Sequence, residues 1–144
     1  MAIVRVPPGA EHYDIEWCVE VGAEVEAGQA LAWLCAPGRC GLQALSAPAR
    51  GRVATRWTGL LKTVRADEAV AVVGDGDVAG VKAAETGRLV MQAEVVREEL
   101  RALDAKRAGR SGAGAALLDA DVARLTRWLD DAQRALREAG VQVA

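Results

Sequence analysis

Two periodicities divide the chain into two parts. In residues 1–76, apolar and polar side chains alternate in short runs such as residues 15–21, Ile-Glu-Trp-Cys-Val-Glu-Val. Alternation with a period of two residues is typical of a β-strand with one buried face. Between residues 82 and 139, leucine and valine instead recur every three or four residues, as they do in amphipathic helices. We therefore expect a β domain over 1–76, a glycine-rich linker over 77–81 and a helical hairpin over 82–144.

The β part contains an internal repeat with an offset of 39 residues. Val25 corresponds to Val64, and the run 30–33 (Ala-Leu-Ala-Trp) corresponds to 69–72 (Ala-Val-Ala-Val). Self-similarity of this kind predicts two matching β units related by a pseudo-twofold axis. The predicted fold class is therefore mainly β plus α: a barrel or sandwich of two pseudo-symmetric halves, followed by an antiparallel α-helical hairpin.

Apolar residues form a seam along each expected helix, with alternating intervals of four and three residues. The seam residues and one flanking tryptophan that we expect at a helix interface are Leu89, Val96, Leu100, Leu103, Leu118, Val122, Leu125, Trp128, Leu129 and Leu136. A seam of this period keeps one stripe of a helix against another helix. The short connection at 109–114 makes the two helices antiparallel. Asp119 or Asp121 can cap the second helix, and Gly140 ends it.

The two helices need a further surface to pack against. Each buries only one seam in the other, and short isolated helices are marginal in water. The further surface is either the β domain or the hairpin of a second copy, and we predict a homodimer through these helices. Trp128 either fills the flank of the helix core or anchors the interface.

Composition narrows the classes of partner. The formal net charge of -2 gives no sign of the clustered lysine and arginine that bind nucleic acid. No uninterrupted run of about 18 apolar residues is present, so we expect no membrane association. The three cysteines are an odd count, and the N-terminus has no export signal, so we expect reduced thiols in a cytoplasmic protein.

Catalytic motifs are missing from the sequence. There is no P-loop, no dinucleotide fingerprint and no Gly-x-Ser-x-Gly, and the single histidine, His12, lies in a polar turn. The acidic residues Asp75 and Asp77 lack the spacing of a calcium loop. We therefore expect a protein that is not an enzyme and that holds no metal or cofactor.

The first part of the chain resembles a known family. Gly22, Val25, Gly28-Gln29 and Leu31-Ala32 match the pattern Gly-Asp-x-Val-x-x-Gly-Gln-x-Leu-Ala of the biotinyl/lipoyl attachment domains. The resemblance covers residues 2–74 and implies a flattened, lipoyl-like β-barrel of two quasi-equivalent halves. In that family a lysine at the tip of the hairpin joining the halves carries the cofactor. The second half departs from the pattern, because Leu61-Lys62 replaces the second Gly-Asp and Asp67 replaces the second turn glycine.

The attachment lysine is absent. Counting forward from Gly28 places it at Gly38, counting back from Pro48 places it at Cys40, and Arg39 lies between. An amide to lipoate or biotin needs a primary amine, which a guanidinium does not supply. The resemblance therefore implies the fold of a carrier without its cofactor.

Two cysteines flank this position. Ala36-Pro37-Gly38-Arg39 is a strong type II turn, and a two-residue tip of this kind places Cys35 and Cys40 opposite each other. Opposed positions approach closely enough for a disulfide. The pair is open to three interpretations: two small hydrophobic residues, a redox-responsive thiol pair, or a reactive thiol that carries an acyl group or a metal.

Three hypotheses for function follow. The first is a non-catalytic binding or assembly module that associates through its helical tail. The resemblance alone suggests that its partner belongs to a 2-oxoacid dehydrogenase or biotin-dependent carboxylase assembly. The second is a carrier subunit of such a complex, with an unorthodox thiol site. The third is a thiol-disulfide switch at Cys35 and Cys40.

Overall fold

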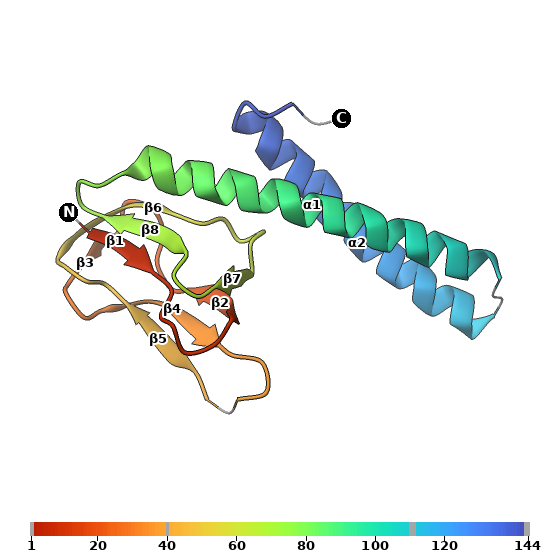
Figure 1. Ribbon diagram of the computed structural model, residues 1–144, viewed down its shortest axis with the longest axis horizontal. Coiled ribbons are helices and arrows are strands. Elements are labelled where there is room, and N and C mark those ends of the chain that lie inside the picture. The colour runs from red at the N-terminus through yellow and green to blue at the C-terminus, as the bar shows by residue number, and fades with distance from the viewer. Residues whose placement is uncertain (1, 40, 110–111, 143–144) are drawn as a thin grey trace. The chain divides into compact units, whose positions relative to one another are not determined.

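The computed structural model describes residues 2–39, 41–109 and 112–142. The chain divides into two compact units, Met1–Glu85 and Thr86–Ala144, which are described separately. Figure 1 shows that the strands lie in the first unit and that most of the helical residues lie in the second. No helix in the described ranges is both long and apolar enough to span a lipid bilayer.

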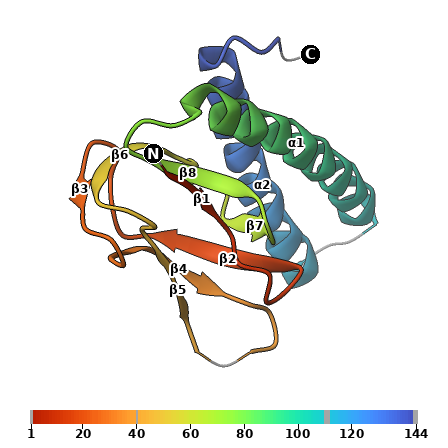
Figure 2. The same cartoon turned by 60° about the vertical axis from the view of Figure 1, so that its left-hand side comes forward.

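The first unit is built from two curled antiparallel sheets. One sheet has the strand order β1-β8-β6-β3 and the other has the order β5-β4-β2-β7. Figure 2 shows β1 and β8 in one layer, with β2, β4 and β5 in the other. The strands are β1 (Ala2–Arg5), β2 (His12–Trp17), β3 (Glu24–Val25), β4 (Ala30–Cys35), β5 (Gln43–Ser46), β6 (Gly51–Arg56), β7 (Thr63–Arg65) and β8 (Ala69–Val73).

The two sheets confirm the predicted repeat. Adding 39 to the residue numbers takes β2 to β6, β3 to the start of β7 and the start of β4 to the start of β8. The remaining strands, β1 and β5, take the same place in the two strand orders with an offset of 41. The pairing register repeats as well: Glu16 lies opposite Trp33 in one sheet, and the equivalent Thr55 lies opposite Val72 in the other.

The repeat extends to turns in which the side chains differ. The Gly28 amide donates to the Ala47 carbonyl at 2.8 Å, and the equivalent Asp67 amide donates to the Val6 carbonyl at the same distance. Gly28 has φ 83°, and Asp67 is the one non-glycine residue with positive φ in the described part of the chain, at 64°. Aspartate tolerates this left-handed conformation better than most residues do. The turn therefore keeps its geometry although the expected glycine is missing.

The core of the first unit is aliphatic, with aromatic rings at its ends. Its fully buried side chains include Leu31, Leu34, Val64, Val70 and Trp57. Trp17 and Arg56 occupy equivalent positions in the two halves. The Arg56 guanidinium carbon lies 5.5 Å from the centre of the Trp17 ring, within cation–π range. The two halves therefore meet through unlike side chains at equivalent positions.

Helix α1 (Val78–Ala108) begins earlier than the sequence pattern indicates. The Gly80 amide donates to Asp77 Oδ1 at 2.8 Å, which makes Asp77 the N-cap of the helix. The segment expected as a linker, 77–81, is therefore the cap and first turn of α1. The Thr58 amide also donates to Glu85 Oε1 at 2.6 Å, so the first turns of the helix belong to the β unit.

The second unit contains the rest of α1 and α2 (Ala113–Glu138). Figure 1 shows α2 running back beside α1, and an ion pair between Arg107 and Asp119, 3.0 Å apart, joins their ends. The N-cap of α2 is Gly112, which makes no side-chain cap bond. The expectation that Asp119 or Asp121 caps this helix is therefore wrong, because the helix starts before them.

Burial is uneven along the seam of the helical unit. Leu89 and Leu136 are buried, as are Ala93 and Ala132. The remaining seam positions and the flanking tryptophan are half-buried: Val96, Leu100, Leu103, Leu118, Val122, Leu125, Trp128 and Leu129. Most of the positions predicted for the seam are therefore only partly covered.

Candidate functional site

The connection between β4 and β5 is the candidate site that the sequence singles out. The Arg39 amide donates to the Ala36 carbonyl at 3.2 Å, and Gly38 has φ 75°, as the turn prediction requires. Gly38 and Arg39 are exposed. Cys40, the third candidate for the attachment position, lies outside the described residues.

The hairpin is longer than a two-residue tip. The pairing of β4 with β5 ends with Leu34 opposite Gln43, so residues 36–42 form the connection. The expected opposition of Cys35 and Cys40 cannot be followed in this pairing, because Cys40 lies outside the described residues. Cys35 has a free thiol and is half-buried, and its pairing with Cys40 stays a prediction.

A hollow of about 450 Å³ lies beside this hairpin, on the outer face of the sheet β5-β4-β2-β7. Trp33 and Leu42 give it an apolar wall, and their side chains are 41% and 64% exposed. Asp14 and Glu16 from β2 supply carboxylates, and Lys62 supplies an ammonium group. The lining residues are Asp14, Ile15, Glu16, Trp33, Cys35, Leu42 and Lys62.

Sequence reasoning identified Cys35 here and missed the rest. Composition places Trp33 in the core, because the tryptophans are the only bulky rings expected in an aliphatic core. Lys62 was noted only as a departure from the family pattern. Its carbonyl accepts a hydrogen bond from the Ile15 amide at 2.7 Å, which fixes the Lys62 backbone beside β2. The sequence did contain one signal for this site: Trp33 is much larger than its repeat partner, Val72.

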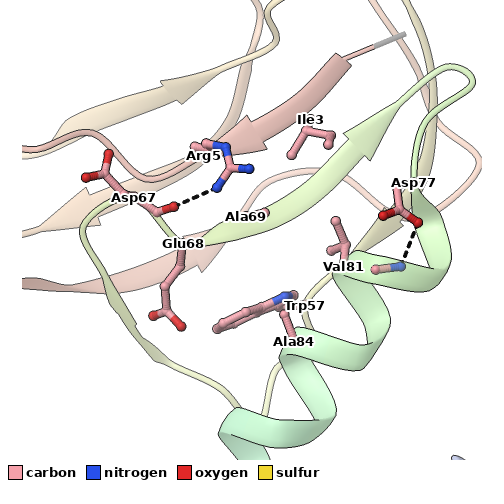
Figure 3. Close-up of a pocket in the computed structure, with 10 residues that line it drawn as sticks. Ile3, Arg5, Trp57, Asp67, Glu68, Ala69, Asp77, Val81 and Ala84 are labelled. Atoms are coloured by element: carbon pink, nitrogen blue, oxygen red, sulfur yellow. Dashed lines mark hydrogen bonds between the residues drawn. The ribbon is translucent and has the colours of Figure 1, made fainter.

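A second hollow, of about 340 Å³, lies between the β1–β8 side of the first unit and the first turns of α1. Figure 3 shows Ile3, Arg5 and Ala69 on the strand side, with Val81 and Ala84 on the helix. Here Arg5 Nη1 donates to the Asp67 carbonyl at 3.0 Å, so its guanidinium supports the strained turn.

The same hollow contains few reactive groups. The Trp57 indole is fully buried, and its Nε1 has no hydrogen-bond partner among the described residues. Asp77 is used by the helix cap, and Glu68 accepts from the Arg65 amide. No group of three histidine, cysteine or acidic side chains able to hold a metal is found in the described ranges. The arrangement is that of packing between a helix and a sheet.

The environment of Glu85 shifts the titration of its carboxyl group. Burial raises the pKa of its carboxyl above the ordinary value of 4.5. The hydrogen bonds from Thr58 and the nearby charges of Lys82 and Arg56 oppose this rise in pKa and are too weak to cancel it. Glu85 therefore fastens the start of α1 to the β unit at the cost of burying a charge.

Comparison with known proteins yields little. No protein family matches the sequence, and no curated protein matches it. Two solved structures of the ectoine utilization protein EutE (DoeB) from Ruegeria pomeroyi are similar to part of the chain. The apo structure has 23% identity and a TM-score of 0.43, and the product-bound structure has 22% and 0.39. In both, the match covers 51% of this chain and 22% of the other.

Proposed function

We propose that this chain is a non-catalytic assembly module, made of a biotinyl/lipoyl-like β unit without an attachment lysine and a helical hairpin that associates with a second copy. The observation that carries the proposal is the hairpin that joins the two halves. It has Gly38, Arg39 and Cys40 where the resemblance calls for lysine, and none of them supplies the primary amine that the amide needs. The repeated strand order and turn hydrogen bonds support the lipoyl-like fold.

Lys62 does not replace the missing lysine. It lies beside the hairpin, on the connection that precedes β7, and its backbone is tied to β2. A swinging cofactor needs an amine at the end of a projecting turn, and Lys62 instead lines a hollow on the sheet. A role in docking fits this position better than a role in group transfer.

The helical unit supports self-association. Most of its seam is half-buried, and two helices gain little stability from one partly covered stripe. A second hairpin would cover the rest of the seam. A docking partner in a 2-oxoacid dehydrogenase or biotin-dependent carboxylase assembly follows from the resemblance alone.

The test is intact mass and peptide mapping of the chain purified from its native host, with and without reductant. We expect the mass of the unmodified chain in every preparation. An adduct on Cys35 or Cys40 would overturn the proposal in favour of a carrier with a thiol site. A species lighter by two hydrogens, present only without reductant and mapped to these cysteines, would favour the thiol-disulfide switch.

A further inference from the structure

The two halves of the β unit have equivalent strands, but their outer faces differ in how far they are covered. In one sheet, Ile3, Val72 and Thr55 lie side by side on adjacent strands. In the other sheet, the equivalent row is Ala44, Trp33 and Glu16. Residues directly opposite each other in neighbouring strands share a face of the sheet, so each row marks one outer face.

A helix covers the first of these faces. Val72 is 0% exposed and Thr55 is 4% exposed, and Val81 is buried. Ile3 and Val81 line the same hollow, and Figure 3 shows them facing each other across it. The first turns of α1 therefore lie over this row, fastened by the bond between Glu85 and Thr58.

The equivalent face on the other sheet is open. Trp33, in the place of Val72, is 41% exposed, and Glu16 and Ala44 are exposed as well. Leu42 adds a second exposed apolar side chain at the edge of the hollow. An exposed tryptophan beside an exposed leucine, with charged groups around them, is typical of an interaction site.

We propose that this open face, defined by Glu16, Trp33, Cys35, Leu42 and Lys62, binds an amphipathic helix of a partner protein that carries lysine or arginine beside its apolar stripe. The covered half shows that a helix with apolar residues three positions apart, Val81 and Ala84, fits a face of this register. The 450 Å³ hollow receives the apolar side chains of such a helix.

Charge complementarity sets the chemistry of the partner. The covered hollow has Arg5 beside Asp67 and Glu68 on its strand side, and the start of the helix over it has Asp77, Lys82 and Glu85. The open face is acidic on balance, because Asp14 and Glu16 stand on it against one Lys62. The Asp14 carboxylate also accepts from Thr63 Oγ1 at 3.4 Å, which holds it on this face. A basic helix therefore fits where an acidic one would be repelled.

The probe that tests this proposal is a peptide of residues 76–90 of this chain, the segment that covers the equivalent face. The substitutions Ala79→Glu and Ala83→Lys, present in every peptide, supply the carboxylate and the amine of a side-chain lactam that holds it helical. The further substitutions Asp77→Lys and Glu85→Lys make it basic. The matched control is the same stapled peptide without these two substitutions. Each is titrated into the full-length labelled chain and followed by amide and indole resonances.

We expect saturable shifts centred on Trp33, Cys35 and Leu42, with the basic peptide binding at least about fivefold tighter than the control. Trp33→Ser should weaken the basic peptide by at least about tenfold. Glu16→Lys should remove its advantage over the control peptide. Val21→Ser changes an exposed valine that does not line the hollow and should leave binding unchanged.

Three results would overturn the proposal. The first is the absence of a saturable shift with millimolar basic peptide. The second is equal binding by the two peptides, or shifts centred on Ile3 and Val81. The third is a Trp33 resonance that moves with the concentration of the chain alone, which would assign the face to a second copy. The proposal does not depend on the mass of the chain and would stand beside any result for the hairpin cysteines.

Discussion

At the scale of single residues, Asp67 holds a backbone conformation that its repeat partner holds with glycine. Its φ of 64° costs an L-residue free energy, whereas Gly28 at 83° has no Cβ to crowd. The hydrogen bonds of Asp67 to Val6 and Arg5 use only its backbone, so any residue can make them. The side chain therefore contributes strain without a bond that requires it.

We predict that Asp67→Gly raises the free energy of unfolding by up to about 1 kcal/mol, since relief of the left-handed strain exceeds the added entropy of the unfolded chain. Gly28→Ala, at the equivalent turn, should lower it by about 1 kcal/mol. Urea denaturation followed by circular dichroism measures both. A loss of stability in Asp67→Gly would mean that the Asp67 carboxylate stabilises the fold through an interaction other than the backbone hydrogen bonds.

Two glycines of α1 should respond to alanine in opposite ways. A Cβ on Gly80 would lie 2.1 Å from Asp77 Oδ2 and push the capping carboxylate away, whereas a Cβ on Gly87 meets nothing within 4 Å. We expect Gly87→Ala to stabilise the chain by about 1 kcal/mol through helix propensity. We expect Gly80→Ala to lose that gain, because disrupting the cap costs about 1 kcal/mol. Equal stabilisation by both substitutions in thermal melts would contradict Asp77 as the N-cap.

Glu85 gives the chain a pH dependence. Its folded-state pKa is raised by burial, so the stability that its protonated form contributes is fully present below the ordinary value of 4.5. That stability is lost as the pH rises through the folded pKa. We expect wild type to gain stability relative to Glu85→Gln as the pH falls from neutral towards 4.5. Glutamine keeps an acceptor for the Thr58 amide and removes the charge, so a constant difference across this range would refute the assignment.

At the scale of elements, the repeat was predictable and the boundaries were not. The offset of 39 is visible because strand residues recur, as at Val25 and Val64 and in the runs 30–33 and 69–72. The start of α1 was missed because glycines around Asp77 indicate a joint by composition, although the aspartate itself is a cap. A helix N-cap and a flexible linker are both rich in aspartate and glycine, so the two are distinguished only by whether a helix follows.

The open face could not be found from the pattern alone. Trp33 and Val72 occupy equivalent positions in equivalent strands, yet one is exposed and the other is fully buried. The difference depends on the first turns of α1, which pack over the sheet that contains Val72. Periodicity reports which side of a strand an apolar residue takes, and it does not report what lies on that side.

At the scale of the whole molecule, we predict a dimer formed through the helical unit. Light scattering at tens of micromolar should give twice the chain mass of 15.1 kDa. Leu103→Glu and Val122→Glu place charges on the half-buried seam and should give monomers. Leu117→Glu alters an exposed leucine outside the seam and serves as the control. A wild-type monomer, or a variant dimer with unchanged helix content, would contradict the interface.

The start of α1 has a consequence for how this chain extends itself. At the offset of 39, the hairpin residues Gly38 and Arg39 correspond to Asp77 and Val78, where the helix begins. The β unit thus has two equivalent outlets. One is closed by a turn, and at the other the chain continues as a capped helix. The start of this helix is therefore the symmetry mate of the hairpin turn.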